Sequence, residues 1–348
     1  MVESHSEEDF FFNKRKEEKA NKKIAGRTDR SRFKKTDQKK KQPQTKSDDL
    51  PTGRVLAILP EGIIVETAGK ELMCTLAGVL KKDFSRKKNL LTIGDFVFYD
   101  GERRIVRVQE RRSVLSRREH LRRHQEQLIA ANIDQVLITV SVGAPPLKPA
   151  LVDRYIIATQ KGHMAPLIVI NKIDLLETHP EEKALLEAFL PIYKSLGIPT
   201  LLVSASTGEG IELLRKQMAH KSSVFSGQSG VGKSALIQAV TGVALSTGTL
   251  TKKTLKGSHT TTKAILIPLG DESFCIDTPG IRSFGVWDLK REDLESYFPE
   301  IHEVGMRCHF PNCTHSHEPD CAVQQAASEE RISLLRLNSY LKLLEETI

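Results

Sequence analysis

The sequence predicts a multidomain protein in which a small β-barrel, a doubly wound α/β domain and a mostly helical Cys/His-rich domain follow a basic tail. Three observations predict this order. Short runs of alternating apolar and polar residues follow residue 50, β-branched runs alternate with helical patterns in mid-chain, and three of the five cysteines crowd together near the end. We expect the domain boundaries at 1–50, 51–118, 119–284 and 285–348.

The composition is that of a globular protein. Of 348 residues, 39% are apolar and 28% are charged, and no apolar run approaches the roughly 18 residues of a membrane span. Phe10, Phe11 and Phe12 stand among Glu and Lys residues, which excludes a signal-peptide core. We therefore expect a cytoplasmic protein without a membrane partner.

The tail carries most of the excess positive charge. The chain has a net charge of +8, and Phe11 to Lys46 alone holds 15 Lys or Arg against 4 Asp or Glu. Such a segment buries too little apolar surface to fold alone, so we interpret it as a disordered basic tail. It either binds a polyanion such as RNA, with release of counterions, or serves only to keep the protein soluble.

The β-barrel is expected over residues 51–118. "GRVLAILPEGIIVETAGKELMCTLAG" and "IGDFVFYDGERRIVRVQERRSVLSR" alternate in short runs broken by Gly, which indicates four or five strands. Arg86–Lys88 and the Arg-rich run from Arg103 to Arg123 favour a barrel of the oligonucleotide-binding type. The alternative is a barrel whose charges only face solvent.

The α/β domain is predicted by short apolar strands, several of them separated by helical segments at Pro149 to Lys161 and Glu181 to Leu196. The strands are "IDQVLITVSV", "PLIVIN", "PTLLVSAS", "SSVFSG", "AILIPLG" and "SFCID". Buried parallel strands joined by crossover helices form a doubly wound sheet, and such sheets bind ligands at the carboxyl ends of the strands. The candidate motifs described next fall in the loops at that edge.

A phosphate-binding loop is predicted at "GQSGVGKS", between the strand "SSVF" and the helical "ALIQAV". This is the context that the G-x-x-x-x-G-K-[ST] pattern requires. Backbone N–H groups of the loop would surround the α- and β-phosphates, Lys233 would reach the β- and γ-phosphates, and the Ser234 hydroxyl would bind Mg²⁺. The candidate nucleotide-binding residues are Gly227, Gln228, Ser229, Gly230, Val231, Gly232, Lys233 and Ser234.

Recognition of guanine is predicted at "NKID", which follows the strand "PLIVI". The Asp174 carboxylate can accept both N1–H and N2–H of guanine, a donor pair that adenine lacks. Lys172 can lie along the base, and Asn171 can tie this loop to the phosphate loop. In "SAS", Ser204 and Ala205 are candidates for a second base loop whose backbone N–H meets guanine O6.

Two switch segments are expected after the phosphate loop. In "DTPG", Asp277 would hold Mg²⁺ through water and the Gly280 N–H would meet the γ-phosphate. In "GSHTTTKA" one of three threonines would bind Mg²⁺, and Thr261 is the choice, with Thr260 and Thr262 left open. His259 is the candidate catalytic side chain because Ile281 stands where a Ras-like enzyme places its glutamine; the alternative is an ordinary exposed histidine, with a partner supplying the catalytic group.

The order of these motifs is unusual, because both base loops precede the phosphate loop. This order arises if the chain of an ordinary GTPase is cut after the strand of its second switch and its original termini are joined. No residue then moves in space, and such circular permutation is tolerated where the termini lie close together. The second switch then leads directly into the C-terminal region. We therefore predict a circularly permuted P-loop GTPase domain.

With "NKID", "GQSGVGKS", "GSHTTT", "DTPGIRSFG" and the Cys/His cluster in this order, the chain from about residue 50 to 348 resembles the RsgA (YjeQ) family of small ribosomal subunit biogenesis GTPases. The resemblance implies a GTPase of low intrinsic rate that binds GTP and GDP, associates with the 30S subunit and 16S rRNA, is stimulated by the subunit and acts late in its maturation. The family's switch histidine corresponds to His259. We expect a monomer.

The resemblance also implies a metal site at the C-terminus. The family pattern C-x₄-C-x-H-x₅-C is met by Cys308, Cys313, His315 and Cys321, a set suited to one closed, structural Zn²⁺. The alternatives are His309 or His317 as the imidazole ligand, or reduced cysteines without a metal. Cys74 and Cys275 lie in strand-like runs and are expected simply to be buried.

Two other functions remain open at this point. One is a GTP-sensing RNA-binding module that hydrolyses GTP too slowly to matter. The other is a permuted GTPase that acts on the large ribosomal subunit, which the barrel before and the Cys/His cluster after the GTPase domain argue against.

Overall fold

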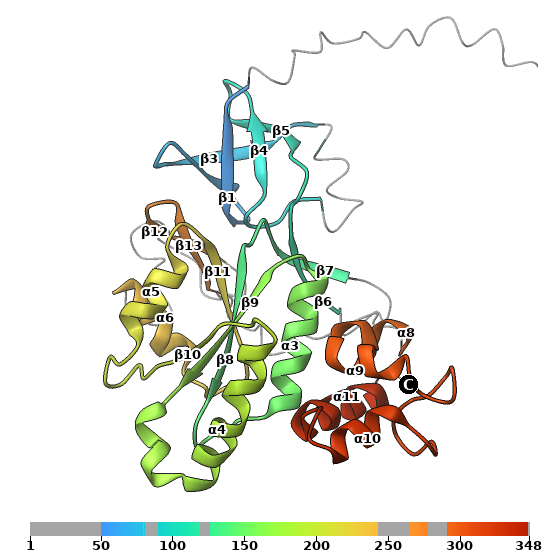
Figure 1. Ribbon diagram of the computed structural model, residues 1–348. Helices are drawn as coiled ribbons and strands as arrows, with labels where there is room; N and C mark the ends of the chain where they lie inside the picture. The colour runs from blue at the N-terminus through green and yellow to red at the C-terminus, as the bar shows by residue number, and fades with distance from the viewer. Residues whose placement is uncertain are drawn as a thin grey trace, which may run out of the picture. The chain divides into compact units, whose positions relative to one another are not determined.

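Figure 1 shows the computed structural model of the chain. The structure describes residues 50–78, 80, 90–118, 126–242, 265–277 and 291–346. The basic tail, Arg86–Lys88, His259, Thr261 and Gly280 lie outside these residues. None of the described helices combines the length and the apolar character that crossing a membrane needs.

The N-terminal part is a closed five-stranded barrel, as expected. Its strand order is β1-β2-β3-β5-β4, and β4 pairs with β1 to close it. Alternate residues point inward and form a core around Val55, Val65, Cys74 and Ile105, which is the packing that the period-two pattern requires. The strands are β1 (Thr52–Ile58), β2 (Ile63–Thr67), β3 (Lys70–Leu76), β4 (Phe96–Tyr99) and β5 (Arg104–Val108).

The barrel is shorter than the sequence suggests. Its last strand ends at Val108, and the next strand, β6 (Val114–Arg118), pairs with β7 (Glu126–Ala131) in a separate two-stranded sheet. At the base of this hairpin, Ser113 donates its hydroxyl to the Ile133 carbonyl at 2.5 Å and accepts the Ile133 N–H at 2.8 Å. The alternating pattern up to Arg117 therefore predicted a strand correctly but assigned it to the wrong sheet, since alternation does not specify a partner.

The central domain is built on a six-stranded sheet with the order β10-β9-β8-β11-β13-β12. All neighbouring strands are parallel except β12 and β13, which form an antiparallel hairpin at one edge. The strands are β8 (Gln135–Ser141), β9 (Ala165–Asn171), β10 (Thr200–Leu202), β11 (Ser222–Ser226), β12 (Ile265–Gly270) and β13 (Ser273–Asp277). The strand of the phosphate loop, β11, thus follows three others in the chain and yet lies inside the sheet.

Helices cover both faces of this sheet (Figure 1). Val136, Ile138 and Val140 of β8 belong to the core that also holds buried residues of α3 (Pro149–Lys161) and α4 (Pro180–Ser195). Leu137 of the same strand belongs to the opposite core, with residues of α5 (Ile211–Met218) and α6 (Lys233–Thr241). This two-sided burial explains why the strands are almost continuously apolar.

The C-terminal part is mostly helical, as predicted. It contains α8 (Arg291–Leu294), the 3₁₀ turn η4 (Glu295–Tyr297), α9 (Pro299–Gly305), α10 (Ala322–Ser328) and α11 (Leu334–Glu346). The sequence suggested one helical stretch from about Ser328, but the chain turns there. Glu330 has a φ of 58° and the Arg331 N–H returns to the Ala326 carbonyl at 2.8 Å, which is how a left-handed residue ends a helix.

A buried ionic network joins α3 to the C-terminal helices, within the compact unit that residues 50 to 348 form. Arg336 of α11 pairs with Asp153 of α3 and donates Nε–H to Glu300 Oε1 of α9 at 2.6 Å. The Tyr193 hydroxyl donates to Asp153 Oδ1 at 2.8 Å, and the guanidinium lies 4.2 Å from the centre of the Phe298 ring. Asp153 is 1% exposed and Arg336 is 3% exposed, so each charge depends on its partner.

Loss of one partner from this network is expected to be costly. Arg336→Ala should lower the free energy of unfolding by about 3–5 kcal/mol, because it leaves the Asp153 carboxylate buried without its cation. The double variant Asp153→Asn with Arg336→Met removes both charges and should be more stable than Arg336→Ala. Urea denaturation measures both, with Arg331→Ala, an exposed arginine of the same domain, as the control. An equal loss in Arg331→Ala would contradict a special role for the buried pair.

Candidate nucleotide site and metal centre

Residues of three predicted motifs lie at one edge of the central sheet. Asn171 ends β9, Ser226 ends β11 and Asp277 ends β13, and the strands run parallel in the order β9-β8-β11-β13. Carboxyl ends of parallel strands share an edge, so these three residues lie at the same edge of the sheet. Asp277 is the last described residue of its segment and pairs in register with Ile265.

The loop after β11 has the backbone of a phosphate-binding loop. Gly227, Gly230 and Gly232 have φ values of 154°, 86° and 93°, which residues with a side chain rarely adopt. A Cβ at Gly227 would collide with the Thr139 carbonyl, and one at Gly232 would collide with the Asn171 side chain. The loop can therefore pass close to β8 and β9 only because these positions are glycine.

Lys233 begins helix α6 and folds back over this loop. Its Nζ donates to the Gly227 carbonyl at 2.7 Å and the Gln228 carbonyl at 2.6 Å. Ser229 and Ser234 are exposed and Val231 is buried, so the two hydroxyls face outward while the valine anchors the loop. The ammonium, the Ser234 hydroxyl and the start of a helix thus lie together, which suits an anion.

Asn171 connects the phosphate loop to both predicted base loops. Its Nδ2–H donates to the Val231 carbonyl at 2.9 Å, and its Oδ1 accepts the Ala205 N–H at 3.1 Å. The side chain is 2% exposed. One buried amide therefore joins three loops that are about 30 to 60 residues apart in the chain, and it uses the Ala205 N–H that the sequence suggested for guanine O6.

Asp174 and Ser204 also lie side by side. The Ser204 hydroxyl donates to Asp174 Oδ1 at 2.6 Å and lies 2.9 Å from the Ser206 hydroxyl. The hydrogen bond from Ser204 lowers the pKa of the Asp174 carboxyl. This favours the ionised carboxylate, which can accept two N–H groups. Asp174 is also exposed.

A further loop at this edge was not predicted as part of the site. It follows β8 and comprises residues 142–148, with Pro145 next to the phosphate loop: a Cβ on Gly230 would lie 3.4 Å from Pro145 Cδ. Lys172 donates its Nζ–H to the Ala144 carbonyl at 2.6 Å. The carboxyl-end rule could have found this loop, because it follows a buried strand, but it carries no motif.

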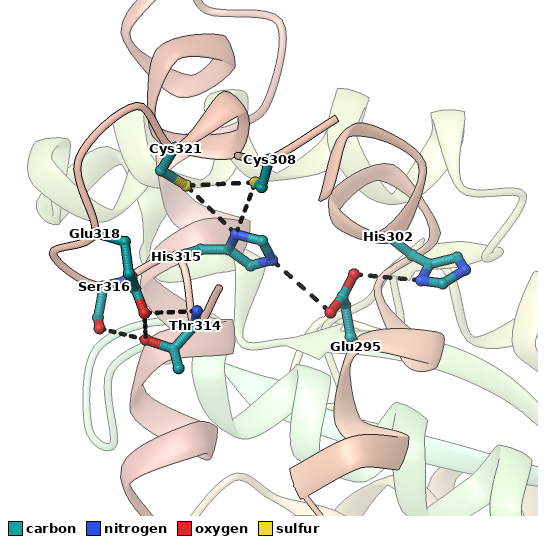
Figure 2. Close-up of polar contacts among 8 residues, drawn as sticks. All are labelled: Glu295, His302, Cys308, Thr314, His315, Ser316, Glu318 and Cys321. Carbon is teal, nitrogen blue, oxygen red and sulfur yellow. Dashed lines mark hydrogen bonds and ion pairs between the residues drawn. The ribbon is translucent and has the colours of Figure 1, made fainter. Parts of the chain in front are cut away.

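The C-terminal cluster brings the four predicted metal ligands together. The donor atoms of Cys308, Cys313, His315 and Cys321 all lie within 4.8 Å of one another. His315 Nδ1 lies 3.6 Å from Cys308 Sγ and 3.4 Å from Cys321 Sγ, and the two sulfurs are 3.8 Å apart (Figure 2). Zn–S and Zn–N bonds of ordinary length give tetrahedral edges of about 3.8 Å for S···S and about 3.6 Å for S···N. The residues fit a tetrahedral Zn²⁺.

Glu295 lies behind the imidazole of this cluster (Figure 2). Glu295 places Oε2 3.8 Å from His315 Nε2, the ring nitrogen that faces away from the sulfurs, and Oε1 3.2 Å from His302 Nδ1. Burial lowers the pKa of His315, which favours the neutral, metal-binding imidazole. A carboxylate behind a ligating histidine is a common arrangement because it orients the ring.

Glu318 organises the loop that carries His315. It accepts the Thr314 N–H at 2.7 Å, the Thr314 hydroxyl at 2.6 Å and the Ser316 N–H at 3.1 Å. Burial opposes ionisation, but these hydrogen bonds outweigh it and lower the pKa of Glu318 to about 2. The two alternative imidazoles, His309 and His317, are exposed and are not members of the four-residue cluster.

Fold and site together define a class of protein. The central sheet is mostly parallel and has a P-loop in its middle, and the base-recognition loops precede that P-loop in the chain. With a five-stranded barrel before this domain and a Cys/His cluster after it, the chain is a circularly permuted P-loop GTPase. The enzyme class is thus a GTP hydrolase.

Comparison with known proteins identifies the family. A family model described as RsgA GTPase matches residues 108–287. The small ribosomal subunit biogenesis GTPase RsgA of Chlorobaculum parvum is 40% identical over 309 residues, covering 84% of this chain and 97% of that protein, and its Bacteroides fragilis counterpart is 34% identical over 283 residues, covering 80% and 91%. This chain belongs to the RsgA GTPase family.

Solved structures agree with this assignment. The crystal structure of YjeQ from Thermotoga maritima superposes with a TM-score of 0.68 at 29% identity and covers 85% of this chain and 98% of that one. YloQ, described as a circularly permuted GTPase, superposes with a TM-score of 0.64 at 24% identity, covering 87% and 96%. The second likeness bears on the fold alone.

Proposed function

We propose that this GTPase acts in assembly of the small ribosomal subunit, binding the 30S subunit, being stimulated by it and completing a late maturation step through GTP hydrolysis. The observation that carries the proposal is the Asn171 side chain, which joins the phosphate loop to the predicted base loops and so supports a single guanine-nucleotide site. The small subunit is proposed as the partner because relatives that align over most of this chain are named small ribosomal subunit biogenesis GTPases.

The geometry supports the following nucleotide roles. Asp174 binds the guanine edge, Lys172 lies along the base, and Ser204 with Ala205 forms the second base loop, in which guanine O6 shares the Ala205 N–H with Asn171. The N–H groups of residues 227–234 and the Lys233 ammonium bind the phosphates. Ser234 and Asp277 would hold Mg²⁺, which supplies charge neutralisation at the β- and γ-phosphates.

The catalytic group is proposed to be His259, with Thr261 binding Mg²⁺ and the Gly280 N–H meeting the γ-phosphate. Ile281 has no polar side chain to orient water, which supports a catalytic group from elsewhere in the switch. His259→Ala should preserve GTP affinity and slow stimulated turnover.

The remaining parts are proposed to bind the subunit. The barrel and the basic tail would contact 16S rRNA, the Cys₃His cluster would hold one structural Zn²⁺, and the protein would act as a cytoplasmic monomer. Exposed Arg103, Arg104 and Arg107 near and on β5 support an RNA-facing barrel surface.

Single-turnover GTP hydrolysis with and without 30S subunits tests this function. We expect clear acceleration by 30S subunits, and co-sedimentation with 30S rather than 50S subunits in a non-hydrolysable GTP analogue. Absence of acceleration would favour a passive GTP-sensing RNA-binding module, and co-sedimentation with 50S would assign the protein to the large subunit.

Specificity for guanine is expected to depend on Asp174. Asp174→Asn should weaken GTP binding by about 100-fold and bring XTP to comparable or better affinity, because the amide nitrogen donates where the carboxylate accepted. Competition between GTP and XTP measures the change, with Glu177→Gln, an exposed residue of the same 3₁₀ segment (Ile173–Thr178), as the control. Unchanged preference in Asp174→Asn would remove this residue from base recognition.

A further inference from the structure

The loop after β8 forms one wall of the nucleotide site, and its backbone has few donors of its own. Pro145 and Pro146 lack an N–H, so the loop from Gly143 to Leu147 has three N–H groups, on Gly143, Ala144 and Leu147. The proline pair therefore limits the number of backbone hydrogen bonds that the loop can donate. The Pro145 carbonyl accepts the Ser141 hydroxyl at 2.9 Å, whereas the Gly143 and Leu147 N–H groups are left to an external acceptor.

Glu182 supplies that acceptor. It lies in the first turn of α4, where an acidic side chain is favoured by the helix dipole. Its Oε1 accepts the Gly143 N–H at 3.0 Å and its Oε2 accepts the Leu147 N–H at 3.4 Å. One carboxylate thus holds both ends of the proline pair, through hydrogen bonds to a charged acceptor, which are stronger than neutral ones.

The loop in turn holds Lys172. The Ala144 carbonyl, between the two clamped N–H groups, accepts the Lys172 Nζ–H at 2.6 Å. Lys172 itself has a φ of 63° and precedes the 3₁₀ segment that carries Asp174. On the other side of the loop, Pro145 lies next to Gly230 of the phosphate loop. The chain of contacts runs from Glu182 through the Ala144 carbonyl to the Lys172 ammonium.

We propose that Glu182 is a positioning residue for nucleotide binding: it clamps the Gly143–Leu147 loop so that the Ala144 carbonyl holds the Lys172 side chain along the base. This inference rests on the proposed role of Lys172 in the guanine site. Because Lys172 is proposed to lie along the base and not at the phosphates, loss of the clamp is expected to weaken binding of GDP and GTP alike and to leave single-turnover hydrolysis at saturating GTP unchanged.

The test is a double-mutant cycle on nucleotide affinity, measured by titration with a fluorescent GDP analogue. Glu182→Ala is expected to weaken binding about fivefold, and Lys172→Ala by at least as much. In the double variant the Glu182 substitution should add little, because its effect acts through Lys172. Glu181→Ala, which removes the neighbouring exposed carboxylate, is the matched control and should bind as the wild type does.

Each other outcome overturns a specific step. Additive effects in the double variant, or normal affinity in Glu182→Ala, would refute positioning through Lys172. Normal affinity in Lys172→Ala, with wild-type protein binding GDP, would refute the base role of Lys172, whereas absence of binding by the wild type would refute the guanine site itself. If Glu182→Ala does not fold, Glu182→Gln, which keeps one acceptor and should weaken binding about threefold, takes its place in the cycle.

Discussion

Removing the Zn²⁺ proposed at the Cys₃His cluster is expected to unfold much of the C-terminal domain. Its helices are short: α8 has 4 residues, while α9 and α10 have 7 each, well below the length at which an isolated helix is stable. Between α9 and α10 the chain has no regular secondary structure. In small zinc domains metal binding contributes about 10–16 kcal/mol of apparent free energy, which is the folding free energy of the domain.

The same result is expected from Cys321→Ser, since Cys321 is buried and is the N-cap residue directly before α10. Metal content, thermal unfolding and limited proteolysis measure it. We expect loss of bound zinc, a lower melting temperature and cleavage within residues 306–320. Helix α11 should resist longer, because Arg336 anchors it to Asp153 of α3.

Cys74→Ala is the matched control for this experiment, because Cys74 is a buried free cysteine in the barrel. It should keep its zinc and its protease resistance in the C-terminal domain. Purified protein without stoichiometric metal, or a Cys321→Ser variant with unchanged proteolysis, would contradict a structural zinc site.

Replacing Lys233 is expected to have the largest effect on catalysis. Lys233→Ala should lower kcat/KM for GTP by about 10²–10³, the usual effect of removing one charged group that stabilises the transition state. In this structure Lys233 also donates to the Gly227 and Gln228 carbonyls, so the substitution loosens the loop as well as removing the charge. GTP affinity should fall together with turnover.

Lys216→Ala, which removes an exposed lysine from α5, controls for the change in net charge and should retain normal activity. Steady-state hydrolysis and titration with a fluorescent GTP analogue are both needed, because they separate binding from chemistry. Near-normal kcat/KM in Lys233→Ala would show that this loop is not the phosphate site.

Local motifs could be predicted from the sequence because their chemistry requires neighbouring residues in a definite spacing. "GQSGVGKS" needs glycines where φ is positive, and Gly227, Gly230 and Gly232 have such values. The four metal ligands lie within one short segment, and the structure gathers them within 4.8 Å. Strand and helix patterns predicted the sheet and α3 closely, since burial on one or both faces imposes a period on the sequence.

Contacts between residues distant in the chain could not be predicted from the sequence. The hydrophobic period of an element shows which of its faces is buried but not which element covers that face. Strand β6 continues the alternation of the barrel strands and nevertheless pairs with β7. The Arg336–Asp153 pair spans 183 residues, and Glu182 reaches Gly143 across 39. Nothing in the local sequence marks these carboxylates as buried or as clamps.

The sequence by itself determined the chemistry of this protein: a phosphate loop, a guanine motif before it and a Cys₃His set after it, each recognisable because a few adjacent residues must supply the ligands. Only the tertiary structure decided how these parts are connected. The side chains of Asn171, Glu182 and Arg336 make contacts between separate segments, and such contacts exist only after the chain has folded. Their energies depend on burial and on partners that no local pattern specifies.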